Sequence, residues 1–112
     1  MIINRLNAYK IMWLFVMFDL PTETKAERKA ASDFRKHLLA DGFTMFNYSI
    51  YVRHCPSTEN AEVHIQRTIR NLTDKGHITI LDTTDKQFGR MRVFKGKKPS
   101  KPITGWQQLE LF

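Results

Sequence analysis

The sequence lacks the features that mark several classes of protein. Its single cysteine, Cys55, excludes an internal disulfide. No apolar run approaches the ~18 consecutive residues that a membrane-spanning helix needs, so we expect no membrane partner. No secretory signal is evident, and we expect a cytoplasmic location. The five glycines are scattered, which excludes a glycine-rich phosphate loop and a dinucleotide fingerprint.

Metal-binding and nucleophilic motifs are missing as well. The four histidines lack paired ligand spacing, and Cys55 has no second cysteine with which to build a zinc site. His54 and Cys55 are no catalytic dyad, because adjacent residues of a strand point to opposite faces. We expect structural or surface roles for all four histidines, which are His37, His54, His64 and His77.

Acidic residues are scarce relative to basic ones. The chain has 18 Lys and Arg against 11 Asp and Glu, a formal charge of +7. Residues 89–112 concentrate the excess, with six bases and one acid. Such a cluster indicates a polyanionic partner, although a solvated tail has the same composition. The bases are Arg90, Arg92, Lys95, Lys97, Lys98 and Lys101.

An apolar run over residues 11–18 is the clearest structural signal. Its length and the turn residues after it predict a buried central strand. Pro21 cannot continue a sheet ladder, so the strand stops before it and presents Asp19 at its end. An aspartate there is either a cap for the following turn or a ligand for a metal ion.

The next segment predicts a helix between Thr24 and Gly42. Thr24 and Glu27 fit a capping box. A four-residue spacing predicts the buried stripe of Ala26, Ala30, Phe34 and Leu38. The opposite face carries the cations Lys25, Arg28, Lys29 and Lys36, which either touch phosphates or form an ordinary solvated surface.

Residues 43–54 predict one strand, or two strands broken near residues 47–49. A second helix is expected after Pro56, with the buried stripe of Ala61, Ile65, Ile69 and Leu72 and an end at residues 74–76. Residues 77–81 return as a strand. This order predicts an α+β fold, a ferredoxin-like βαββαβ sandwich with its helices on one sheet face. The open face of so small a chain favours a homodimer packed through the sheets.

One carboxylate holds Mg²⁺ poorly, because the ion usually takes one or two carboxylates together with water and substrate phosphates. A symmetric dimer that brings two copies of Asp19 together supplies the second carboxylate. Asp19 is therefore the candidate catalytic and metal-binding residue.

Four segments resemble the small CRISPR-associated adaptation protein Cas2, in its type II form. They are residues 18–21, Arg28 with Lys29, Gly42-Phe43 together with residues 47–53, and residues 84–88. The resemblance implies a dimeric ferredoxin-like protomer with an extra C-terminal strand. It also implies a function in CRISPR spacer acquisition, as a scaffold that binds double-stranded protospacer DNA between two dimers of the adaptation integrase.

The resemblance also implies roles for particular residues. Asp19 matches the metal-binding aspartate, Arg28 a basic position, Ser49 a serine and Tyr51 an aromatic position. Phe18 and Met45 depart from the family, which often has a tyrosine and a basic residue at these two positions. The missing hydroxyl and the missing cation could have oriented or neutralised a phosphate, so their absence weakens the case for efficient catalysis. Enzymatic activity is therefore left open. The alternatives are a free-standing, metal-dependent endoribonuclease of the toxin type, or a single-strand RNA binder with exposed sheet aromatics.

The chain is expected to divide into a ferredoxin-like domain at residues 1–94 and a basic hinge with an apolar tail at residues 95–112. Candidate nucleic-acid-binding residues are Lys25, Arg28, Lys29, Arg90, Arg92, Lys95, Lys97 and Lys98. The tail is too apolar for a solvated segment, so it is expected to contact the dimer or the integrase. Its candidate partner-binding residues are Ile103, Trp106, Leu109, Leu111 and Phe112.

Overall fold

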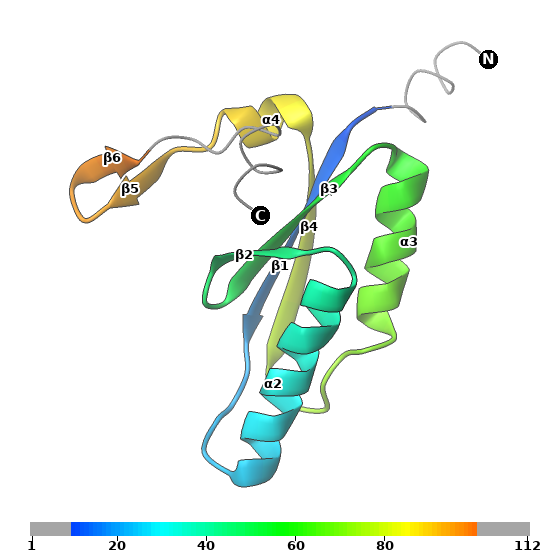
Figure 1. Ribbon diagram of the computed structural model, residues 1–112, viewed down its shortest axis with the longest axis vertical. Helices are drawn as coiled ribbons and strands as arrows, with labels where there is room; N and C mark the ends of the chain where they lie inside the picture. Colours follow the sequence, from blue (N-terminus) through cyan, green and yellow to red (C-terminus); the bar gives the residue numbers. More distant parts are fainter. Residues whose placement is uncertain (1–9, 101–112) are drawn as a thin grey trace.

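The computed structural model describes residues 10–100 of the chain. A four-stranded antiparallel sheet has the strand order β2-β3-β1-β4, and the two long helices cover one of its faces (Figure 1). This arrangement confirms the ferredoxin-like α+β prediction. In chain order the elements are β1 (Met12–Asp19), α2 (Lys25–Ala40), β2 (Thr44–Asn47), β3 (Ile50–Cys55), α3 (Thr58–Ile69), β4 (His77–Thr84), α4 (Asp85–Gly89), β5 (Val93–Lys95) and β6 (Lys98–Ser100).

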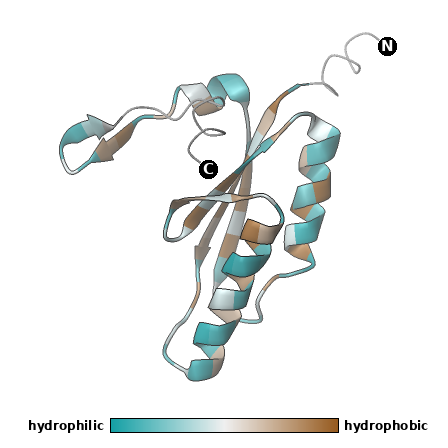
Figure 2. Ribbon diagram, in the orientation of Figure 1, coloured by the Kyte–Doolittle hydropathy of each residue, from teal (hydrophilic) through white to brown (hydrophobic). Residues whose placement is uncertain are grey.

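Strand β1 lies in the middle of the sheet and contributes to both faces, as its apolar run predicts (Figure 2). Alternate side chains enter the core beneath the helices, because successive residues of a strand point to opposite faces. These four side chains are buried: Met12, Leu14, Val16 and Phe18.

Helix α2 begins with the predicted capping box. The Thr24 hydroxyl accepts from Glu27 N at 3.1 Å, and Glu27 Oε1 accepts from Thr24 N at 2.9 Å. Gly42 follows the C-cap with a φ of +89°, a conformation that favours glycine. The predicted capping box and the predicted end of the helix before Gly42 are therefore both confirmed.

The predicted stripe of α2 is wrong in its first half. The buried residues are Ala31, Phe34 and Leu38, while Ala26 and Ala30 are exposed. A strict four-residue spacing drifts by about 40° per step around a helix of 3.6 residues per turn. The first alanines are therefore rotated away from the sheet.

Helix α3 shows a similar correction. Ser57 is the N-cap and Ala61 is buried, but Ile69 and Leu72 are 44% and 48% exposed. His64 and Thr68 are buried instead, with the Thr68 hydroxyl donating to His64 O at 2.9 Å. The helix ends at Ile69, before the predicted stop at residues 74–76.

Residues 43–54 form two strands, the second of the two predicted alternatives, with the break at Tyr48 and Ser49. The two strands, β2 and β3, pair with each other as an antiparallel hairpin. The register shifts between Met45 and Asn47, which marks a β-bulge in β2. Tyr51 is 3% exposed and belongs to the core under the helices.

The second face of the sheet is partly covered by α4, which the sequence did not predict. Trp13 is fully buried there, stacked on Phe88 with ring centroids 3.9 Å apart, and its Nε1 donates to Asp85 Oδ1 at 2.8 Å. Phe15 remains half-buried and Leu81 is 47% exposed on this face. Packing of two sheets through it stays a prediction. No helix within residues 10–100 is long and apolar enough to cross a membrane.

Strands β5 and β6 pair with each other as a separate antiparallel hairpin, which extends from the body next to α4 (Figure 1). This hairpin contains the expected extra C-terminal strand and spans the expected boundary between residues 94 and 95. The predicted tail contacts, Ile103, Trp106, Leu109, Leu111 and Phe112, lie outside the described residues. The division into two parts stays a prediction.

Candidate functional site

Asp19 is the last residue of β1 and is exposed. Among residues 10–100, no hydrogen-bonding or ion-pairing partner of its carboxylate is found. Its neighbour across the sheet is His77, the first residue of β4. Directly opposite residues of an antiparallel pair share a face, so the carboxylate of Asp19 and the imidazole of His77 lie on the same face of the sheet at this end of β1, without an ion pair between them.

His77 was expected to have only a structural or surface role. Its exposed position agrees with that expectation, but the strand register also sets it opposite Asp19. The sequence holds no signal for this pairing, because the register of β1 with β4 is set by the whole sheet.

Gly76, in the loop before β4, packs closely against the backbone at the end of β1. A Cβ atom at Gly76 would lie 2.6 Å from Asp19 O and 3.0 Å from Leu20 Cα, and the residue has a φ of +89°. Only glycine permits both the conformation and the close approach. The loop before β4 therefore packs directly on the end of β1.

Ser49 and Tyr51, two further residues that the resemblance matched, lie in different environments. Ser49 is exposed and its carbonyl accepts from Phe18 N at 3.0 Å, which places the hairpin turn beside Asp19. Tyr51 is buried against Phe18, with ring centroids 5.6 Å apart. The structure thus brings Ser49 to the site and assigns Tyr51 to the core.

The metal-binding capacity of one chain is small. The described part of the chain holds no group of three or more His, Cys, Asp or Glu side chains suited to an ion. Asp19 and His77 together offer one carboxylate and one imidazole. This donor set fits Mg²⁺ only if substrate phosphates, water or a second Asp19 complete the coordination.

The cations at the start of α2 are exposed, but two of them already have partners. Lys29 Nζ lies 2.8 Å from Asp33 Oδ2, and this hydrogen bond raises the pKa of Lys29. Arg28 Nη1 donates to the carbonyls of Thr22 and Glu23, both at 3.1 Å. Within the described residues, Lys25 alone of the predicted three has no ion pair or hydrogen bond.

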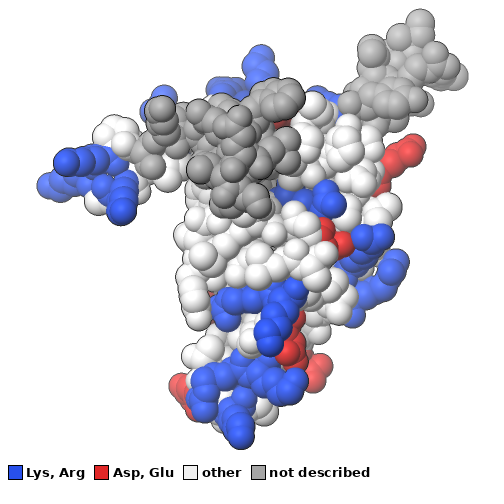
Figure 3. All heavy atoms as spheres, in the orientation of Figure 1, with Lys and Arg blue, Asp and Glu red and all other residues white. Residues whose placement is uncertain are grey.

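The cations at and after the end of α4, unlike Lys29, are not engaged in ion pairs with other described residues. All five of the predicted residues in this region are exposed or half-buried, and none forms an ion pair within residues 10–100. Figure 3 shows basic side chains over the first turns of α2, and again over the β5–β6 hairpin. We call the five predicted cations from the end of α4 to the start of β6 the hairpin cations; they are Arg90, Arg92, Lys95, Lys97 and Lys98.

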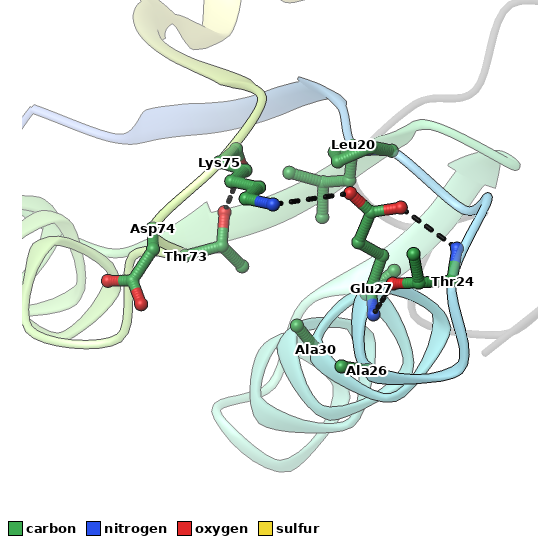
Figure 4. A pocket seen from close by; sticks show the side chains of 10 residues that line it. Leu20, Thr24, Ala26, Glu27, Ala30, Thr73, Asp74 and Lys75 are labelled. Atoms are coloured by element: carbon green, nitrogen blue, oxygen red, sulfur yellow. Dashed lines mark hydrogen bonds and ion pairs between the residues drawn. The ribbon is translucent and has the colours of Figure 1, made fainter.

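A cavity of about 190 Å³ lies between the first turns of α2 and the loop that precedes β4 (Figure 4). Ala26 and Ala30 form part of its wall, while Glu27 and Lys75 meet across it at 3.7 Å. The Glu27 carboxylate is held by the capping box, and backbone hydrogen bonding lowers its pKa. Asp19 does not line this cavity, so the cavity is separate from the carboxylate at the end of β1.

Residues 12–91 match the model of the family described as CRISPR associated protein Cas2. A protein of Flavobacterium psychrophilum, named CRISPR-associated endoribonuclease Cas2, is 57% identical over 97% of this chain and 95% of its own length. Proteins with the same name from Parvibaculum lavamentivorans and Paracidovorax avenae are 52% and 40% identical. They cover 90% and 96% of this chain, and 100% and 99% of their own lengths.

Proposed function

Because the chain belongs to the CRISPR-associated Cas2 family, we propose that it is the homodimeric scaffold of CRISPR spacer acquisition, in its type II form. The hairpin cations carry this proposal. Five positive charges at the surface lack carboxylate partners within the described residues, as a surface for a nucleic-acid backbone requires. Phosphate contacts of this kind position a protein on a duplex without reading its sequence.

The proposed dimer forms through the sheet face that the long helices leave open. Phe15 and Met17 of β1 lie on this face beside Leu81 of β4, which is 47% exposed. Apolar side chains gathered on one face favour association with a second copy. Equilibrium sedimentation tests the dimer, and replacement of Leu81 by glutamate is expected to dissociate it.

A conditional nuclease site accompanies the scaffold in this proposal. The two Asp19 carboxylates of the dimer would hold Mg²⁺, with phosphate and water completing the coordination. The ion, when bound, polarises the scissile phosphate and lowers the pKa of a water molecule. In this proposal Lys25, which is exposed on α2, would offset negative charge, and the imidazole of His77, opposite Asp19 in the strand register, would accept a proton.

The second candidate function is a free-standing, metal-dependent endoribonuclease. The exposed Asp19 with His77 beside it favours this function, as does the name carried by the similar proteins. The two functions differ in what they require. A ribonuclease needs Asp19 for its biological effect, whereas a scaffold needs the basic surface and its partners.

The proposed partner of the scaffold is the adaptation integrase, Cas1. The apolar residues 103–112, which lie outside the described part of the chain, are proposed to bind it by adding a strand to a sheet. Truncation after Lys101 is expected to leave a folded dimer that no longer co-purifies with the integrase. An intact dimer that still captures the integrase contradicts this role of the tail.

Co-purification of the full chain with its cognate integrase, with and without a protospacer duplex, tests the main proposal. A complex that contains both proteins and is strengthened by the duplex is expected. Failure to associate under both conditions, together with robust RNA cleavage by the purified dimer, would instead establish the ribonuclease.

A further inference from the structure

Tyr48 has an unusual environment for a residue at the tip of a hairpin. Its side chain is 72% exposed, yet one face of its ring is covered by the guanidinium of Arg35, with Cζ 4.2 Å from the ring centroid. Large aromatic residues on a protein surface more often lie flat against apolar neighbours. Here the ring stacks on a cation, and most of its surface stays open to solvent.

Arg35 links this ring to the core. Its Cζ lies 5.3 Å from the ring centroid of Phe18, and Phe18 in turn packs against Phe34 and Tyr51 at 5.3 and 5.6 Å. Within residues 10–100, Arg35 has no carboxylate partner, and its buried Nε has no hydrogen-bond acceptor. The guanidinium is therefore positioned by aromatic contacts, and no carboxylate of the described residues neutralises its charge.

The backbone of the turn is held as well. Asn47 Oδ1 accepts from Ser49 N at 3.0 Å, which closes a tight local turn around Tyr48. Ser49 O accepts from Phe18 N at 3.0 Å, which ties the turn to the end of β1. Tyr48 thus stands on a fixed support close to the strand end that carries Asp19.

We propose that Tyr48, supported by Arg35, is a stacking platform for an unpaired nucleobase. This inference rests on the proposed nucleic-acid-binding function and adds a ligand class to it. An aromatic ring offers one face to a base, and such stacking tolerates any sequence because every base has a π-face. The uncompensated charge of Arg35 beneath the ring favours a ligand that carries phosphates over an apolar peptide.

A fully paired duplex does not supply this ligand along its length. Its bases are stacked on each other, and a ring held on a rigid hairpin cannot reach between them without unstacking a step. Single-stranded segments present free base faces. The platform is therefore expected to distinguish nucleic acids with unpaired nucleotides from blunt duplexes of equal charge.

The test measures binding by fluorescence anisotropy with four labelled probes. They are a blunt DNA duplex, the same duplex with single-stranded ends, the latter with abasic sites in its unpaired positions, and an RNA single strand. The abasic probe keeps every phosphate and removes only the bases. We expect the wild-type protein to bind the duplex with single-stranded ends at least about fivefold more tightly than its abasic form.

Substitutions at Tyr48 separate stacking from other contributions. Tyr48→Leu keeps apolar bulk and is expected to abolish the preference for intact bases, whereas Tyr48→Phe keeps the ring and the preference. Neither variant is expected to change blunt-duplex affinity or its dependence on salt, because both leave every cation in place. Arg35→Lys preserves the charge but not the planar support, and should reduce the preference. Melting temperatures of all variants control for folding. Tyr48 is exposed, so its substitutions should affect folding little. Arg35 is half-buried, so the melting temperature of Arg35→Lys shows whether its effect on binding comes from a loss of folding.

The outcomes separate this inference from the proposed scaffold. Equal affinity for intact and abasic probes overturns the platform, even if blunt-duplex binding supports the scaffold. A base-dependent preference without blunt-duplex binding supports the platform and overturns the scaffold. If Tyr48→Leu lowers the melting temperature but leaves the preference for intact over abasic probes unchanged, the contact between Tyr48 and Arg35 only stabilises the fold. The proposed base-stacking role of Tyr48 is then refuted. The RNA probe decides whether the base comes from RNA as well as from DNA.

Discussion

The Asp41 carboxylate and the His64 imidazole meet at 2.8 Å in the interior, between the C-terminus of α2 and the middle of α3. Their side chains are 7% and 5% exposed. The second oxygen of Asp41 accepts from Arg67 Nη1 at 2.8 Å, so both oxygens of the carboxylate are satisfied. This arrangement joins the two long helices over the sheet.

Replacement of Asp41 by alanine is expected to lower the free energy of unfolding by about 2–4 kcal/mol, because it leaves a buried imidazole without its partner. Asp33→Ala is the matched control. It removes an exposed ion pair with Lys29, which solvent screens, so it should change the free energy of unfolding much less than Asp41→Ala does. Chemical denaturation measures both. Equal effects would contradict a structural role for the buried pair.

The same carboxylate predicts a dependence of stability on pH. Burial raises the pKa of Asp41, but the hydrogen bonds from His64 and Arg67 outweigh it and hold the pKa below its ordinary value of 3.8. The carboxylate therefore stabilises the fold fully above its unfolded pKa, and this contribution disappears as the pH falls through the lower folded pKa. The stability difference between wild type and Asp41→Asn should shrink over that acidic range. A difference that persists at low pH would contradict this account.

Gly76→Ala is expected to destabilise the protein by about 2 kcal/mol or more, because it combines a positive φ with a clash against Asp19 O. Gly89→Ala is the control: a Cβ there meets no atom within 4 Å, so stability should change by about 0.5 kcal/mol or less. Thermal unfolding compares the two variants. Tolerance of alanine at residue 76 would show that the end of β1 moves freely.

Asp19→Ala is expected to abolish any Mg²⁺-dependent cleavage while leaving dimerisation and duplex binding roughly unchanged, because the carboxylate is exposed and lies outside the hairpin cations. Cleavage of labelled RNA and DNA, with and without chelator, measures the first effect. Size-exclusion chromatography and duplex binding measure the second, and spacer acquisition in cells is expected to stay largely intact as well. If acquisition collapsed while the purified variant stayed folded and dimeric, the scaffold would require the carboxylate.

Duplex binding is expected to weaken steeply with salt. Neutralisation of about eight phosphates by the dimer gives a slope of log affinity against log salt of about −7. Lys97→Glu together with Lys98→Glu should flatten the slope by about 1 for each phosphate that the protein no longer neutralises. Arg70→Gln, an exposed cation that follows α3 and lies outside both basic groups, should leave the slope unchanged. Tight binding that ignores salt would contradict the electrostatic account.

The sequence alone predicted the features that depend on near neighbours. The apolar run that ends before Pro21, the capping box of Thr24 and the break in the hairpin near Tyr48 all appear in the structure. Each depends on the conformational preferences of a few consecutive residues. The order of these elements was sufficient to predict the ferredoxin-like arrangement.

Tertiary structure decided which distant side chains meet. His77 lies opposite Asp19 only because the register of β1 and β4 is fixed by core packing along the sheet. His64 occupies a buried position of α3 because Asp41, at the C-cap of α2, supplies its imidazole with a partner. Only the fold places the guanidinium of Arg35, a residue of α2, under the ring of Tyr48. Periodicity describes one element at a time, whereas these contacts depend on how several elements pack together.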